Sequence, residues 1–109
     1  MSKIDFLDVL QTAVNDPGSF KSGECLEEHV LGNARKFLVS DWVGLIEALC
    51  EWISMKREPQ TMLAISVAKE LKLREIRYVI EDLRQEVSVG KVFPKFYLRD
   101  IDEALSILL

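Results

Sequence analysis

The sequence predicts an all-α protein. The chain has 109 residues, of which 49% are hydrophobic and 29% charged, a composition typical of globular domains. Apolar residues recur every three or four positions in six segments, and turn residues such as Asn15-Asp16-Pro17-Gly18 separate them. We therefore expect one helical domain over residues 1–109, a compact antiparallel stack of helical hairpins that is either HEAT-like or an irregular bundle.

The first two segments each show one apolar face. A helix is expected over residues 3–15, where Ser2 and Asp5 fit a capping box. A second helix is expected over residues 23–38, with Ser22 as its N-cap. Their apolar positions predict that they pack on the rest of the domain. These positions are Phe6, Leu7, Val9, Leu10, Ala13 and Val14 in the first, and Leu26, Val30, Leu31, Ala34, Phe37 and Leu38 in the second.

The third segment, residues 41–55, is the most apolar, with Ser40 or Asp41 as its cap. Hydrophobic side chains cover more than half of its circumference, which predicts a central helix. Trp42 and Trp52 are both expected in the core. The same pattern also fits a dimer seam, so the sequence leaves open whether the chain is a monomer or a weak dimer.

Three further helices are expected over residues 59–71, 73–87 and 101–109. Pro59 fits a first helical turn, and Gly90 follows the end of the fifth segment. The very short link around Lys72 predicts that the fourth and fifth helices form a tight antiparallel pair. Residues 91–98 read as an aromatic loop or short strand that covers one end of the core, and Asp100 is the expected cap of the last helix.

Signatures of catalysis and of cofactor or metal binding are missing from the sequence. His29 is the only histidine, and Cys25 lies four residues before it with no third group to orient the pair. Two cysteines and one histidine are one ligand short of a closed zinc site, and no phosphate-binding glycine motif occurs. We therefore predict a protein without enzymatic activity, cofactor or metal, in which Cys25 and Cys50 are reduced thiols.

The charge is unevenly distributed along the chain. Residues 1–55 carry four basic and nine acidic side chains, a net charge of −5, whereas residues 56–109 sum to +1. An acidic surface disfavours nucleic acid and favours a basic protein as partner, although an ordinary solvated face would look the same. Tyr78 lies opposite the apolar face of its helix, either beneath a neighbouring segment or as an exposed anchor. The candidate partner-binding residues are Asp5, Asp8, Asp16, Glu24, Glu28, Asp41 and Tyr78.

A winged helix-turn-helix over residues 61–98 is the best nucleic-acid interpretation. Residues 74–87 would be the recognition helix and residues 90–98 the wing. Four acidic residues on that helix would repel phosphate groups, which argues against this alternative. They are Glu75, Glu81, Asp82 and Glu86.

Residues 52–105 resemble the small helical immunity proteins of bacterial polymorphic toxin systems, including those of contact-dependent growth inhibition. Trp52, Pro59 and Thr61 lead into LAISVAKEL over residues 63–71, and IDEAL over residues 101–105 closes the region. Between them lie Leu73, Glu75, Ile80, Glu81, Leu83, Gly90, Phe93 and Tyr97. These are mostly core and turn positions, and the resemblance covers about half of the chain.

The resemblance implies a cytoplasmic protein that binds and blocks one cognate toxin domain. Contact residues vary within the family, so none is carried over to this chain. A general helical adaptor or assembly subunit is the main alternative. Membrane insertion is not expected, because no apolar run approaches the roughly 18 residues that span a bilayer.

Overall fold

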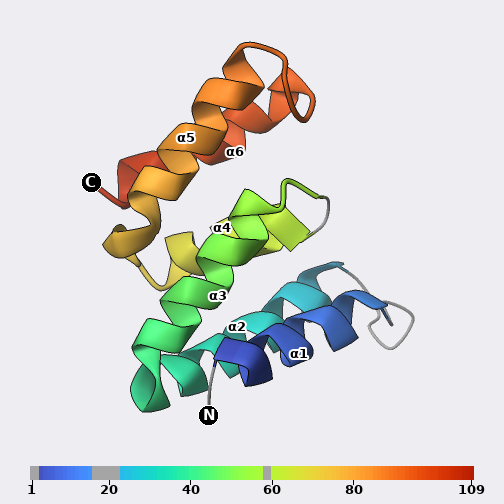
Figure 1. Ribbon diagram of the computed structural model, residues 1–109, viewed down its shortest axis with the longest axis vertical. Helices are drawn as coiled ribbons and strands as arrows, with labels where there is room; N and C mark the ends of the chain where they lie inside the picture. Colours follow the sequence, from blue (N-terminus) through green and yellow to red (C-terminus); the bar gives the residue numbers. More distant parts are fainter. Residues whose placement is uncertain (1–2, 16–22, 58–59) are drawn as a thin grey trace. The chain divides into compact units, whose positions relative to one another are not determined.

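The computed structural model describes residues 3–15, 23–57 and 60–109 (Figure 1). These residues form six α-helices and contain no strand, which confirms the all-α class. The chain divides into two compact units, Met1–Ala48 and Leu49–Leu109. The helices are α1 (Lys3–Asn15), α2 (Gly23–Ser40), α3 (Trp42–Ser54), α4 (Gln60–Glu70), α5 (Arg77–Ser88) and α6 (Leu98–Ile107), with short 3-10 turns η2 (Arg74–Ile76) and η3 (Lys95–Tyr97).

The first unit contains an antiparallel hairpin of α1 and α2, drawn in blue and cyan in Figure 1. The rings of Phe6 and Phe37 join the two helices, with their centroids 4.9 Å apart and both side chains buried. Leu10 on α1 and Val30 on α2 are also fully buried. The predicted inward faces of the two helices are confirmed at these four positions. The predicted caps Ser2 and Ser22 lie outside the described residues.

Asp41 caps α3. Its Oδ1 accepts a hydrogen bond from the backbone N–H of Gly44 at 3.1 Å, the pattern that satisfies an unpaired donor in a first helical turn. The Ser40 hydroxyl instead donates to the Lys36 carbonyl oxygen within α2. The cap that the sequence left open is therefore Asp41.

The prediction that both tryptophans lie in the core is correct for Trp52, which is 2% exposed, and wrong for Trp42, which is 51% exposed. The buried side of α3 instead includes Gly44 and Ala48, two small residues. Helical periodicity could not select the buried side, because α3 is apolar on most of its circumference. The exposed side consequently carries large apolar side chains.

Thr61 links the end of α3 to the start of α4 within the second unit. Its fully buried hydroxyl donates to the Trp52 carbonyl oxygen at 2.9 Å and accepts from the Arg57 backbone N–H at 3.0 Å. Lys56, at φ 54°, takes the left-handed conformation that ends many helices. One hydroxyl therefore satisfies two backbone groups where the chain reverses.

Helix α6 packs against both α4 and α5. The expected tight pairing of α4 with α5 is wrong, because α6 is the main helical neighbour of each. The connection is also longer than predicted. Lys72 has a left-handed φ of 53°, Leu73 is buried, and η2 adds one more turn before α5 begins at Arg77.

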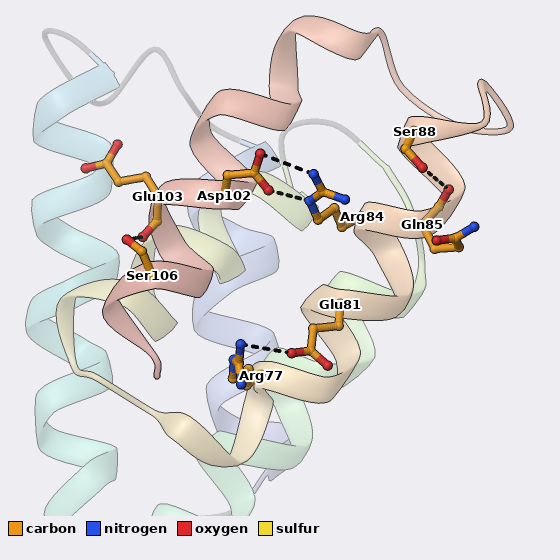
Figure 2. Close-up of polar contacts among 8 residues, drawn as sticks. All are labelled: Arg77, Glu81, Arg84, Gln85, Ser88, Asp102, Glu103 and Ser106. Atoms are coloured by element: carbon orange, nitrogen blue, oxygen red, sulfur yellow. Dashed lines mark hydrogen bonds and ion pairs between the residues drawn. The ribbon is translucent and has the colours of Figure 1, made fainter.

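Ion pairs accompany both contacts of α6. Asp102 binds the guanidinium of Arg84 on α5, and Glu103 lies 3.7 Å from the Lys69 ammonium on α4 (Figure 2 shows the first pair). Hydrogen bonding and the charge of Asp102 raise the pKa of Arg84 above its ordinary value. Adjacent carboxylates of α6 therefore pair with different helices.

Residues 91–98 contain a bend and η3 in place of a strand. Extended backbone at Pro94 leads into the 3-10 turn, which continues directly into α6, so this helix begins at Leu98 and Asp100 lies within its first turn. Phe96 is 71% exposed, so the prediction that it covers the core is wrong. Its ring contacts the ring of Tyr97, with the two ring centroids 4.5 Å apart. The winged-helix alternative also lacks its wing over these described residues.

We predict that Thr61→Val lowers the free energy of unfolding by about 2 kcal/mol, because two backbone groups lose their partner while side-chain volume is kept. Urea denaturation followed by circular dichroism measures the change. Thr61→Ser retains the hydroxyl and is the control. A valine variant more stable than the serine variant would contradict the role of this hydroxyl.

We predict that Phe6→Ala destabilises the first unit by about 3 kcal/mol, because it removes a fully buried ring. Phe96→Ala is the matched control and should change stability by less than about 0.5 kcal/mol. Hydrogen exchange of α1 and α2 amides locates the effect of Phe6→Ala. Unchanged exchange in both helices would show that the Phe6–Phe37 contact does not stabilise the hairpin.

Candidate partner-binding site

The predicted partner-binding residues lie on several helices. Asp5 and Asp8 are exposed on α1, Glu28 is exposed on α2, and Tyr78 is 64% exposed on α5. Asp41 is half-buried before α3. Asp16 lies outside the described residues, and Glu24 lies in α2 without a described side chain.

The exposed side of α1 is acidic. Asp5 and Asp8 lie three residues apart and share one side of the helix with the exposed Ile4. Phe6 and Leu10 occupy the buried side. The exposed, described side chains of α1 thus include two carboxylates and no cation, so this face attracts positively charged groups. They are Ile4, Asp5, Asp8, Thr12 and Asn15.

The exposed side of α2 carries both signs of charge. Glu28 is followed seven and eight residues later by Arg35 and Lys36, which are also exposed. This spacing places all three on the same side of the helix. Arg35 and Lys36 therefore offset the negative charge of Glu28 on α2, so α1 has the more acidic exposed face.

Tyr78 is the exposed aromatic residue of α5, which resolves the alternative left open by the sequence. Glu75 precedes it by three residues, Glu81 and Asp82 follow by three and four, and all are exposed. Glu81 pairs with Arg77 at 3.2 Å (Figure 2). Glu75 and Asp82 make no ion pair with the described part of the chain. Their carboxylates are available to a partner that contacts the tyrosine ring.

Helix α5 presents this face from a well-packed base. Ile80, Leu83 and Val87 are buried, and Arg84 pairs with Asp102 of α6. Tyrosine offers a large apolar surface and a polar hydroxyl with few rotatable bonds, which suits it to an interface. Tyr78, Glu75 and Asp82 form what we call the tyrosine site.

Glu75 and Asp82 were not identified as site residues from the sequence. Their positions three residues before and four residues after Tyr78 were the available signal, since residues at these spacings are neighbours on a helix. That signal depended on Tyr78 being exposed, which periodicity alone did not decide. Both acids were instead read as evidence against DNA binding.

Among the described residues, no group of three or more His, Cys, Asp or Glu side chains could hold a metal ion. In the same part of the chain, no helix has the length and apolar character needed to cross a membrane. Comparisons with protein-family models, curated proteins and solved structures find no match to this chain. The function must therefore be argued from the surfaces.

We predict that Asp41→Ala lowers the free energy of unfolding by about 1 kcal/mol, the usual effect of losing an N-cap. Asp41→Asn removes the charge while keeping an oxygen that can accept the Gly44 hydrogen bond, so it should retain most of the stability. Urea denaturation measures both variants. Equal losses in the two would show that the charge of Asp41, and not its capping bond, stabilises the chain.

Proposed function

We propose that the chain is a protein-binding protein whose partner is a basic protein domain. The observation that carries this proposal is the tyrosine site, where the exposed ring of Tyr78 lies in sequence between two exposed carboxylates, Glu75 of η2 and Asp82 of α5, that form no ion pair among the described residues. A partner that covers Tyr78 gains aromatic burial, and its Lys or Arg side chains find Glu75 and Asp82 as hydrogen-bond acceptors. This combination of contacts favours a basic protein surface.

The charge of the chain supports a basic partner. The formal net charge is −4, and the exposed face of α1 adds Asp5 and Asp8 to the acidic surface. Complementary charge speeds diffusional encounter and suppresses association with acidic proteins. We assign long-range attraction to α1 and direct contact to the tyrosine site.

More specifically, we propose an immunity protein that binds and neutralises one cognate toxin domain stoichiometrically in the cytoplasm. The resemblance of residues 52–105 to such proteins supports this proposal, and that region includes α5 and the tyrosine site. A nuclease toxin has a basic cleft for its substrate, and an acidic surface can occupy such a cleft. The chain would then act by binding alone, as a monomer when free.

A helical adaptor is the second candidate function. The exposed large apolar side chains of α3, Trp42 and Val43, favour it because they suit contact with another protein. A stoichiometric partner with a toxin-like C-terminal domain, captured from the native host and identified by mass, would favour the immunity protein. A cellular assembly captured without a toxin would favour the adaptor.

We predict that Tyr78→Ala weakens binding of the captured partner by about 2 kcal/mol, or roughly 30-fold, as expected for an aromatic hot spot. The double variant Glu75→Lys with Asp82→Lys should weaken it further by placing like charges against a basic surface. Calorimetry with the purified partner measures both. Glu70→Lys, at an exposed position on α4, is the matched charge control and should leave affinity unchanged.

Protection of cells that express the toxin tests the acidic first half separately. Lysine at Asp5, Asp8, Glu24 and Glu28 together should abolish protection while the circular dichroism spectrum is retained. If this variant protects and the tyrosine-site variants fail, the assignment of attraction to the first half is wrong. If both protect fully, the proposed function of these surfaces is wrong.

A further inference from the structure

The exposed side of α3 carries large apolar side chains that do not belong to the tyrosine site. Trp42 is 51% exposed, Val43 is 49% exposed, and Ile46 is half-buried. Glu47 is exposed beside them, since positions 42, 43, 46 and 47 lie on one side of a helix. We call these four residues the tryptophan face. It lies entirely within the first compact unit.

The tryptophan face has the properties of a docking surface. Leu45 and Ala48, on another side of α3, are buried. A helix that is apolar on most sides is normally covered on most sides. Exposed tryptophan is also the residue type most often found to dominate the energy of an interface.

The charge of α3 determines which class of partner can bind the tryptophan face. Glu47 is the one charged residue of the tryptophan face, and α3 contains no cationic residue. A second copy of the chain would oppose the same acidic helix, and its carboxylates would repel. Nucleic acid and anionic lipid surfaces are negatively charged and are disfavoured for the same reason.

We propose that the tryptophan face docks a basic amphipathic helix of a partner protein. The apolar stripe of that helix packs on Trp42, Val43 and Ile46, and a lysine or arginine at its margin pairs with Glu47. In such helix-to-helix recognition, apolar anchors supply affinity and flanking charges supply specificity. The inference does not depend on the immunity function, because it uses neither Tyr78 nor the acidic face of α1.

A synthetic amphipathic peptide of leucine and lysine tests the proposal with the full chain. Trp42 is exposed and Trp52 is buried, so docking should shift the tryptophan emission to shorter wavelength. We expect saturable binding that weakens as NaCl is raised, and no binding of a leucine and glutamate peptide of equal length. Fluorescence anisotropy of the labelled peptide gives the affinity of each variant.

Trp42→Ala and Glu47→Lys should each weaken peptide binding at least tenfold, a loss of about 1.4 kcal/mol or more. Glu70→Lys and Tyr78→Ala should bind the peptide as the unmodified chain does. Both test positions are exposed, so circular dichroism should be unchanged. Equal binding by all variants, equal binding of the acidic peptide, or no binding would overturn the proposal.

Sedimentation of the chain alone tests whether a second copy of the chain covers the tryptophan face. We expect a monomer whose sedimentation is unaffected by Trp42→Ala. A dimer that dissociates in that variant would overturn the proposal, because a second copy would then cover the tryptophan face. Loss of toxin protection in the Tyr78→Ala variant, with peptide binding retained, separates the two surfaces experimentally.

Discussion

The second unit depends on one helix that packs against two others. Ile101, Ala104 and Leu108 are buried at spacings of three and four residues, so one narrow apolar stripe along α6 and its C-cap serves the contacts with α4 and α5. Asp102 and Glu103 extend this arrangement, because one pairs with α5 and the other with α4. The orientation of α5, and therefore the presentation of Tyr78, follows from the packing of α6.

Several carboxylates of the second unit have cationic partners, and two near Tyr78 do not. Glu81, Asp102 and Glu103 have cationic partners, and Glu86 lies 2.5 Å from the Lys56 ammonium. Exposed pairs of this kind add little stability and mainly neutralise charge. Glu75 and Asp82 form no such pair within the described residues. The acidic character that a partner meets on α5 is therefore concentrated beside Tyr78.

Helical periodicity was sufficient for the all-α class and for the burial of Phe6 and Phe37, because each lies on a clear apolar face. It failed at Trp42, where α3 is apolar on most sides and small residues take part of the buried side. Residues 91–98 follow the predicted loop alternative, with bends and a 3-10 turn before α6, but the sequence did not reveal that Phe96 is exposed. Exposure of Asp5, Asp8 and Glu28 was predictable from charge. The exposure of Tyr78 was not, because it depends on whether a distant segment covers α5.

The two proposed surfaces share one physical combination, an exposed aromatic ring with an exposed carboxylate on the same helix. Trp42 with Glu47 provides it in the first unit, and Tyr78 with Glu75 and Asp82 in the second. An exposed ring alone would attract any apolar surface, including that of another copy. A carboxylate on the same surface restricts the range of partners. Acidic surfaces and phosphate groups are repelled, whereas a basic protein gains an ion pair. The net charge of −4 acts in the same direction by opposing self-association. Acidity thus gives the aromatic surfaces their selectivity, which neither feature would supply alone.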